Sequence, residues 1–391
     1  MNVIAKIQNS QNEMSNWRHQ MHQNPELAFE EFWTSDFIAK CLDEMNIPYD
    51  KGIATTGIVA TLKGVQSGSG KSIALRADFD ALEIHECTNL PYASKIEGKM
   101  HGCGHDGHTA MLLGAAKYLV EHRDFDGTVY FVFQPAEEGA GGARVMLEQG
   151  FKEKYPCDAI FGMHNWPGMP IGMAGVKSGA VSAAADRFKF CVTGKGGHAA
   201  MPHLNVDVVT ALSELVMAVQ TIVSRKIDPA DPAVISITQV QAGTGSFNVM
   251  PEDATLGGTV RTFSAQVRQL IEEKLLQMAE GLGKVHDVKI TLEYNHGYPS
   301  VVNSIKETEL AAQAAKVILG EDQVVDFPSI MGAEDFAYFL EKIPGCYILL
   351  GQGTEDKSAA LHSPHYDFND DAAPVGASYW VELVKMALPL K

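Results

Sequence analysis

A two-domain α/β fold is the fold class that the sequence predicts, and three observations point to it. The chain has 391 residues, more than one hydrophobic core usually organises. Its apolar content of 46% is ordinary for a soluble globular protein. Short apolar runs alternate with helical patterns in the first and last parts of the chain, whereas the middle part has a different texture.

The first part of the chain favours a mostly parallel central sheet covered by helices. Helical patterning runs over residues 2–23 and 32–45 and returns over residues 109–121. The apolar runs are short and bounded by Gly, Pro or Asp, as strands are. They cover residues 72–77, 128–133 and 159–163. Strands that alternate with helices in this way build an α/β domain.

A smaller α+β unit is expected from about residue 182. Its elements follow the order strand, helix, strand, strand, helix, strand, which is that of a ferredoxin-like sandwich. They are predicted over residues 187–193, 206–224, 234–241, 255–262, 265–281 and 288–294.

After residue 296 the first texture resumes, with helices near residues 305–318 and 372–386 around a buried-type strand at 346–350. The smaller unit is therefore predicted to be inserted into the larger one. The predicted domains are residues 1–181 and 297–391 for the larger domain and 182–296 for the inserted one.

Composition excludes several classes of protein. A formal net charge of -17, without a Lys/Arg cluster, excludes nucleic-acid binding. Six scattered cysteines in so long a chain predict reduced thiols and not a disulfide framework. The apolar runs fall far short of the roughly 20 residues of a membrane helix, and the first residues lack the apolar core of a secretory signal. We predict a cytoplasmic protein that binds neither nucleic acid nor membrane.

The densest group of metal-binding side chains lies at residues 100–108, Met-His-Gly-Cys-Gly-His-Asp-Gly-His. Cys103 and His105 stand two residues apart in a glycine-rich turn, so a thiolate and an imidazole can be directed at one point, and both suit zinc. A structural zinc knuckle is the alternative, but it would need a second Cys/His pair nearby. The glycine spacing also matches a dinucleotide fingerprint, yet no apolar strand precedes it, which removes a zinc dehydrogenase as well.

Paired glutamates follow another predicted strand, at Glu137 and Glu138. Ligands in open α/β sheets bind at the carboxyl ends of the strands. Adjacent side chains point in different directions, so one carboxylate can hold a metal while the other acts as a general base. On its own, the pair is more simply explained as part of a solvated turn.

Three further strands end in the same kind of residue. One runs into Asp78 and Asp80, one ends at His164, and the loop after a third offers His362 or His365. Alone, such a histidine is more often a packed core residue. Four strands that all deliver Asp, Glu or His at their ends together predict a metal-dependent active site.

Eight segments of the chain resemble the M20 metallopeptidase clan, specifically its amidohydrolase branch of hippurate hydrolases and auxin-conjugate hydrolases. The resemblance covers nearly the whole chain. The segments are residues 76–82, 101–108, 134–139, 162–165, 194–203, 248–251, 258–261 and 362–364. One departure is Glu83, where relatives usually have proline after Asp-Ala-Leu.

The resemblance implies two divalent metal ions per subunit, zinc, manganese, cobalt or nickel. The implied ligands are Cys103, His105, Glu138, His164 and His362. Glu137 is then the catalytic base, a choice between the two glutamates that the residues alone leave open. In similar enzymes the inserted domain dimerises and acts as a lid, placing its histidine, here His198, over the partner's active site. Asn248 and Arg261 resemble the pair that binds the substrate's α-carboxylate, although Arg261 could also be an ordinary surface charge on a strand.

The implied reaction is hydrolysis of the linear amide of an N-acyl amino acid, hippurate-like or N-acetylated, as in an aminoacylase. Glu137 deprotonates a water that the metal ions activate, and His198 stabilises the oxyanion. The expected partners are a small-molecule substrate and further copies of the chain, in a homodimer or a dimer of dimers. The alternatives are a dipeptidase or carboxypeptidase of the same clan, and a catalytically dead metal-binding dimer. The preferred acyl group stays open.

Overall fold

The computed structural model describes residues 1–353 and 359–390 and divides the chain into two compact units. Unit 1 comprises Met1–Val181, Val301–Pro328 and Asp335–Lys391, and unit 2 comprises Ser182–Ser300 and Ser329–Glu334. Unit 2 thus begins at the residue expected from the sequence and ends four residues after the expected position. The short segment 329–334 joins unit 2 because Ile330 forms a β-bridge with Ser182.

An eight-stranded sheet runs through unit 1, in the order β1-β2-β4-β3-β5-β16-β6-β15. Neighbours from β4 to β16 are parallel, whereas β1 and β2 form an antiparallel edge. This confirms the mostly parallel sheet. The strands are β1 Tyr49–Ile53, β2 Gly57–Lys63, β3 Ser72–Asp78, β4 Thr128–Gln134, β5 Ala159–Pro167, β6 Ala174–Gly175, β15 Val324–Val325 and β16 Gly345–Gly353. A separate short pair joins β7 (Gly179–Ser182) to β14 (Val301–Asn303).

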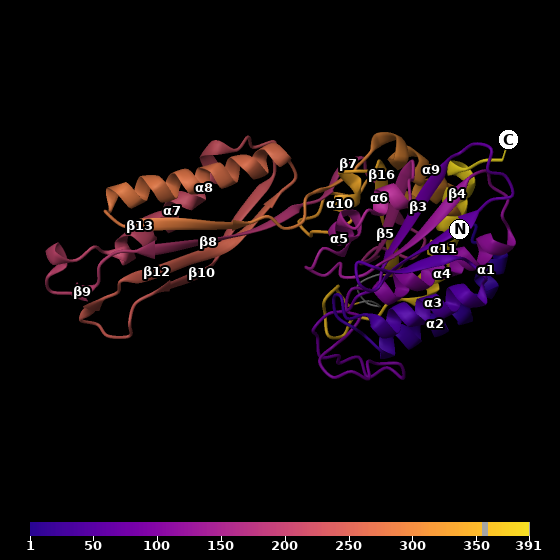
Figure 1. Ribbon diagram of the computed structural model, residues 1–391, viewed down its shortest axis with the longest axis horizontal. Helices are drawn as coiled ribbons and strands as arrows, with labels where there is room; N and C mark the ends of the chain where they lie inside the picture. The colour runs from indigo at the N-terminus through magenta and orange to yellow at the C-terminus, as the bar shows by residue number, and fades with distance from the viewer. Residues whose placement is uncertain (354–358, 391) are drawn as a thin grey trace. The chain divides into compact units, whose positions relative to one another are not determined.

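Helices cover both faces of this sheet, which is why its central strands are apolar throughout. Alternate residues of one strand enter different clusters: Leu75 packs with α2, α4 and α11, whereas Ala74 packs in the cluster that α5, α6 and α10 cover. Figure 1 shows the helices around the sheet. The helices are α1 Ala5–Asn9, α2 Gln11–Gln23, α3 Phe32–Glu44, α4 His105–Glu121, α5 Gly142–Glu148, α6 Phe151–Lys154, α9 Ile305–Leu319, α10 Ala337–Leu340 and α11 Ala373–Ala387.

Unit 2 is an α+β sandwich with the element order that the sequence predicts. Its antiparallel sheet has the order β10-β12-β8-β13, and α7 and α8 pack on one face. Along β8, buried side chains alternate with half-buried or exposed ones, as expected for a sheet with one solvated face. The elements are β8 Ala184–Thr193, β9 Gly197–His198, α7 Val208–Lys226, β10 Ala233–Ala242, β11 Val249–Met250, β12 Asp253–Thr262, α8 Ala265–Val285 and β13 Lys289–Asn295.

Among the described residues, one helix, α7, is long and apolar enough to span a membrane by length and composition alone. Its apolar side chains, including Leu212 and Ile222, are buried in the core of unit 2. Asp207 caps its first turn by accepting the N–H groups of Val209 and Thr210. Helix α7 is thus an amphipathic core helix that packs on the sheet of unit 2.

Candidate metal centre

The carboxyl edge of the unit 1 sheet gathers the side chains that the sequence singled out. His164 lies in β5, Glu137 and Glu138 follow β4, and Cys103 and His105 stand at the start of α4. Gly104 makes this helix start possible, because its φ is +88° and an added Cβ would lie 2.4 Å from Asn165 Oδ1. The parallel strands thus bring distant segments to one place.

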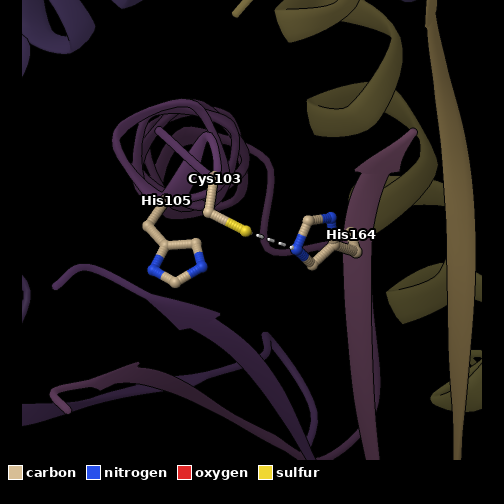
Figure 2. Close-up of side chains that lie close together, drawn as sticks. All are labelled: Cys103, His105 and His164. Atoms are coloured by element: carbon tan, nitrogen blue, oxygen red, sulfur yellow. Dashed lines mark hydrogen bonds between the residues drawn. The ribbon is translucent and has the colours of Figure 1, made fainter. Parts of the chain in front are cut away.

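Two groups of three potential ligands share one cysteine. The ligand atoms of Cys103, His105 and His164 lie within 4.8 Å of one another (Figure 2), and so do those of Cys103, Glu138 and His362. The Cys103 Sγ atom is 3.3 Å from His164 Nε2, and Glu138 Oε1 is 3.3 Å from His362 Nε2. The structure therefore brings together all five ligands that the resemblance implied, and all five belong to unit 1.

Glu137 faces the same centre from the loop after β4. Its carboxylate groups with His105 and Glu138 within the same 4.8 Å limit. The side chain is buried, and its Oε1 lies 3.4 Å from the backbone nitrogen of Asp335, which donates to it. Glu138 thus belongs to one of the two ligand groups, whereas Glu137 lies beside His105 and Glu138, where a general base can meet a metal-bound water.

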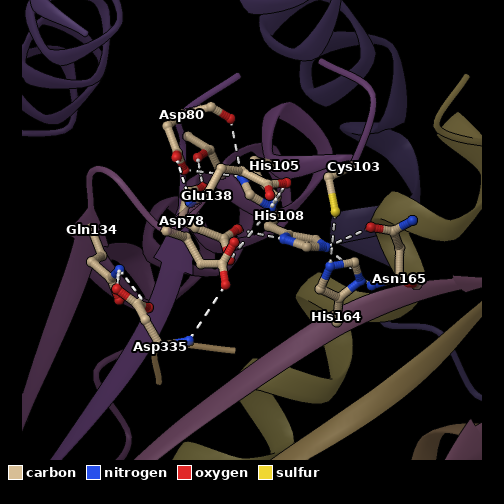
Figure 3. A network of polar contacts seen from close by, with 12 residues as sticks. Asp78, Asp80, Cys103, His105, His108, Gln134, Glu138, His164, Asn165 and Asp335 are labelled. Atoms are coloured by element: carbon tan, nitrogen blue, oxygen red, sulfur yellow. Dashed lines mark hydrogen bonds and ion pairs between the residues drawn. The ribbon is translucent and has the colours of Figure 1, made fainter. Parts of the chain in front are cut away.

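Asp80 fixes both a histidine and a glutamate of the centre. Its Oδ1 and its carbonyl oxygen lie 3.1 and 3.0 Å from His105 Nδ1, and its Oδ2 accepts the Glu138 N–H at 2.8 Å. This arrangement sets the tautomer of His105 and directs its Nε2 into the centre (Figure 3). That Nε2 is buried and has no hydrogen-bond partner among the described residues, which fits a metal ligand.

A second acidic residue, Asp78, supports the other side of the centre. Its Oδ1 lies 2.5 Å from His108 Nδ1, and His108 Nε2 lies 2.6 Å from Asn165 Oδ1 (Figure 3). Asp78 also pairs with Arg76 at the end of β3. The sequence indicated Asp78 and Asp80 as carboxylates at a strand end but assigned no role to them, to His108 or to Asn165.

The protonation states of the centre respond strongly to one another. Burial and the charge of Glu138 raise the pKa of the Cys103 thiol. Hydrogen bonds to Cys103 and Glu138, opposed by burial, raise the pKa of His362 to about 10. Burial, together with His108, lowers the pKa of His164 well below its usual range. A cation in place of the shared protons would stabilise a thiolate and a carboxylate together.

The donor set decides which cations fit. One thiolate, three imidazoles and a carboxylate combine soft and borderline ligands, which suit zinc and other late first-row metals more than magnesium or calcium. The five residues come from distant parts of the sequence, and the Nε2 atom of His105 among them is buried without a hydrogen-bond partner in the described residues. Both features fit a site for divalent metal ions.

The three site residues expected in unit 2 lie at two different ends of its sheet. His198 in β9 pairs with Val249, directly after Asn248, and both histidine and asparagine are exposed. Arg261 lies near the end of β12, opposite Ala185 of β8, and burial beside Arg187 lowers the pKa of its half-buried guanidinium. Within one chain, therefore, Asn248 and Arg261 do not meet.

Comparison with known proteins decides the family. The model of peptidase family M20/M25/M40 matches residues 74–386. The chain belongs to this family. This confirms the resemblance inferred from the sequence motifs, and the relatives described next show that the chain is an amidohydrolase of the M20 type.

Two curated relatives and one solved structure show how far the likeness extends. A hippurate hydrolase of Campylobacter jejuni is 40% identical over 98% of both chains. An N-acetylcysteine deacetylase of Bacillus subtilis is 43% identical over 95% of this chain and 96% of its own. The crystal structure of a dinuclear metal-binding M20 peptidase from Bacillus subtilis matches with a TM-score of 0.85 and 38% identity, over 97% of this chain and 99% of that one.

Proposed function

We propose that this M20 amidohydrolase removes the acyl group from N-acyl amino acids, with two divalent metal ions bound per subunit. The observation that carries the proposal is the pair of three-residue ligand groups that share Cys103. Two overlapping groups provide for two neighbouring ions, whereas a single catalytic zinc needs only three protein ligands. Relatives named for hippurate and N-acetylcysteine hydrolysis support the substrate class.

The chain's own residues divide the chemistry between them. Bound divalent ions lower the pKa of a water and polarise the substrate carbonyl. Glu137, buried beside the ligands, accepts the proton of the attacking water and passes it to the leaving amine. Asp80 keeps His105 oriented during this exchange, and His198 donates to the developing oxyanion. The products are a carboxylic acid and a free amino acid.

His198 is proposed to act on the active site of a partner subunit in a homodimer. The 10 residues of β12 span roughly 30 Å, at about 3.3 Å per residue. His198 and Asn248 lie beyond one end of this strand and Arg261 near the other. One substrate can touch all three only if His198 and Asn248 come from one copy and Arg261 from another.

An uncovered sheet edge in unit 2 supports a second copy as the partner. Strand β10 pairs with β12 on one side and, among the described residues, has no strand on its other side. Val240 on this strand and Phe247 just after it are exposed, Phe247 completely. Edge strands of this kind pair readily with another chain. A dimer of dimers is a further arrangement compatible with the same edge.

The cysteines support a cytoplasmic location for this enzyme. All six are free thiols, and Cys41, Cys103 and Cys346 are buried. Reduced thiols persist in the cytosol and are rare in oxidising compartments.

Turnover of a substrate panel by metal-reconstituted protein tests the proposed function. The panel contains N-benzoyl, N-acetyl and indole-acetyl amino acids beside dipeptides with a free amino group. We expect hydrolysis of N-acyl amino acids, loss of activity on chelation, and two ions per active chain by metal analysis. Faster hydrolysis of the dipeptides would identify a dipeptidase, and no hydrolysis of any amide with both ions bound would identify a catalytically dead metal-binding protein.

A further inference from the structure

The loop that carries the two glutamates contains a residue in a conformation that L-amino acids rarely adopt. Ala136, directly before Glu137, has a φ of +56°. This left-handed region is unfavourable for a residue with a Cβ atom. Such residues persist only where the surrounding structure holds them, and they concentrate at active sites. The loop therefore depends on contacts that offset this conformational cost.

The backbone of Ala136 is held on both sides. Its N–H donates to Oε1 of Glu31 at 2.9 Å, and its carbonyl oxygen accepts the N–H of Gly142 at 2.9 Å. Gly142 belongs to the start of α5, next along the chain. Glu31, in contrast, directly precedes α3 and lies 105 residues away in sequence.

Glu31 is a carboxyl group with no exposed surface. Burial raises its pKa to about 7, although a hydrogen bond from Thr56 acts in the opposite direction. The Thr56 hydroxyl donates to Oε2 at 2.6 Å, which leaves Oε1 directed at Ala136. Burying a carboxyl group is costly, and a hydrocarbon side chain would fill the space without that cost. Glu31 is therefore explained by its two oxygens, which accept hydrogen bonds from Thr56 and Ala136.

We propose that Glu31 is a positioning residue for catalysis, which holds the left-handed turn at Ala136 and thereby directs Glu137 at the reacting water. The proposal rests on the proposed function, in which Glu137 is the general base. Two further hydrogen bonds complete the placement: the Glu138 N–H donates to Asp80, and the Asp335 N–H donates to Glu137. Without Glu31, Ala136 relaxes towards negative φ, and the side chain that follows it changes direction.

The Glu31→Leu variant tests this role, because leucine fills the space but accepts no hydrogen bond. We expect kcat to fall about tenfold to a hundredfold, the effect of a misplaced catalytic group. The KM is expected to stay within about threefold of the wild-type value, because binding of the substrate's ground state is unchanged. Metal analysis should still find the wild-type content of ions. The Glu31→Gln variant keeps an acceptor for the Ala136 N–H and should recover kcat to within about threefold of wild type.

A double variant separates positioning from general stability. Glycine adopts positive φ at no steric cost, so Ala136→Gly added to Glu31→Leu should raise kcat several-fold above that of the single variant. The matched control is Glu26→Leu, because the Glu26 carboxylate accepts the N–H groups of Trp33 and Thr34 at the start of the same helix. This control should lower the thermal midpoint and leave kcat unchanged.

Each outcome decides for or against the role of Glu31. The proposal is overturned if Glu31→Leu keeps the wild-type kcat, or if its defect is explained by loss of metal. It is also overturned if Glu31→Gln is as slow as Glu31→Leu. If the leucine variant does not fold, Thr56→Val decides, since it releases Oε2 of Glu31: a lower kcat with unchanged metal content supports the role, and an unchanged kcat overturns it. A wild-type enzyme without amidase activity, or an active Glu137→Gln variant, would instead refute the proposed function itself.

Discussion

Replacing Asp80 by asparagine measures how strongly the residues behind the ligands hold the metal ions. The two carboxylate oxygens of Asp80 serve two donors, His105 Nδ1 at 3.1 Å and the Glu138 N–H at 2.8 Å. Asparagine offers one oxygen, so if it keeps the Glu138 N–H, His105 Nδ1 faces an NH₂ group and retains only the Asp80 carbonyl oxygen at 3.0 Å. Loss of a hydrogen bond to a charged group costs about 1.5–3 kcal/mol. Since both donors belong to the proposed metal ligands, we expect this cost to appear as weaker metal binding.

We expect the Asp80→Asn variant to bind zinc about 10-fold to 100-fold more weakly, the range known for residues that support metal ligands. Calorimetric titration of metal-free protein, with a competing chelator, measures the change. Asp126→Asn is the control, because Asp126 is similarly buried and accepts the N–H of Ser69. Asp126 lies two residues before β4, at the opposite end of that strand from the glutamates. Zinc affinity within about threefold of wild type in Asp80→Asn would refute this reading of the ligand support.

Four further changes have defined outcomes. Glu137→Gln should lower kcat by about 10² or more with both ions retained, because proton transfer is lost and no ligand is; kinetics beside metal analysis check this, and near-normal turnover would contradict it. Mixing Glu137→Gln chains with His198→Ala chains should restore activity, because one site of each heterodimer regains both groups. If the subunits exchange and no activity returns, His198 acts at the site of its own subunit. Gly107→Ala should lower the melting temperature, since its Cβ would lie 2.3 Å from the Phe368 ring and overpacking costs about 1–3 kcal/mol; an unchanged calorimetric midpoint would contradict it. Despite burial, hydrogen bonds to carboxylates raise the pKa of His22 from 6.5 to about 9. The stabilisation from this histidine is therefore complete below pH 6.5 and is lost as pH rises through 9. The free energies of unfolding of wild type and His22→Gln, measured in urea, should converge over that range.

The sheet and the ligand set could be predicted because local patterns encode them. A run such as residues 128–133 is apolar on both faces, which marks a strand between two helical layers, and its end marks the edge where ligands gather. The short strand β1, with Asp50, Lys51 and Gly52, has no such pattern, so the antiparallel edge of the sheet was not expected. Its pairing with β2 comes from tertiary packing, which overrides a weak local preference.

The supporting residues could not be predicted because their contacts join distant parts of the chain. Asp335 accepts hydrogen bonds from Gln134, 201 residues earlier (Figure 3), and from Arg76, 259 residues earlier. No periodicity or spacing connects such positions. Likewise, only the three-dimensional structure shows that Glu31 accepts a hydrogen bond from the loop after β4. The same is true of Asn248 and Arg261, which were expected to bind one carboxylate but lie near opposite ends of β12.

The length of the strands in unit 2 sets the distance between Arg261 and His198. Arg261 and His198 are separated by most of β12 and of its neighbour β8, so every residue added to these paired strands would move the two side chains apart by about 3.3 Å. A single insertion would also turn Arg261 to the opposite face, because side chains alternate along a strand. Viable relatives should therefore tolerate insertions in the loops of this unit but keep β8 and β12 at constant length. Alternatively, they should change both strands together by two residues, with a matching shift elsewhere in the proposed dimer.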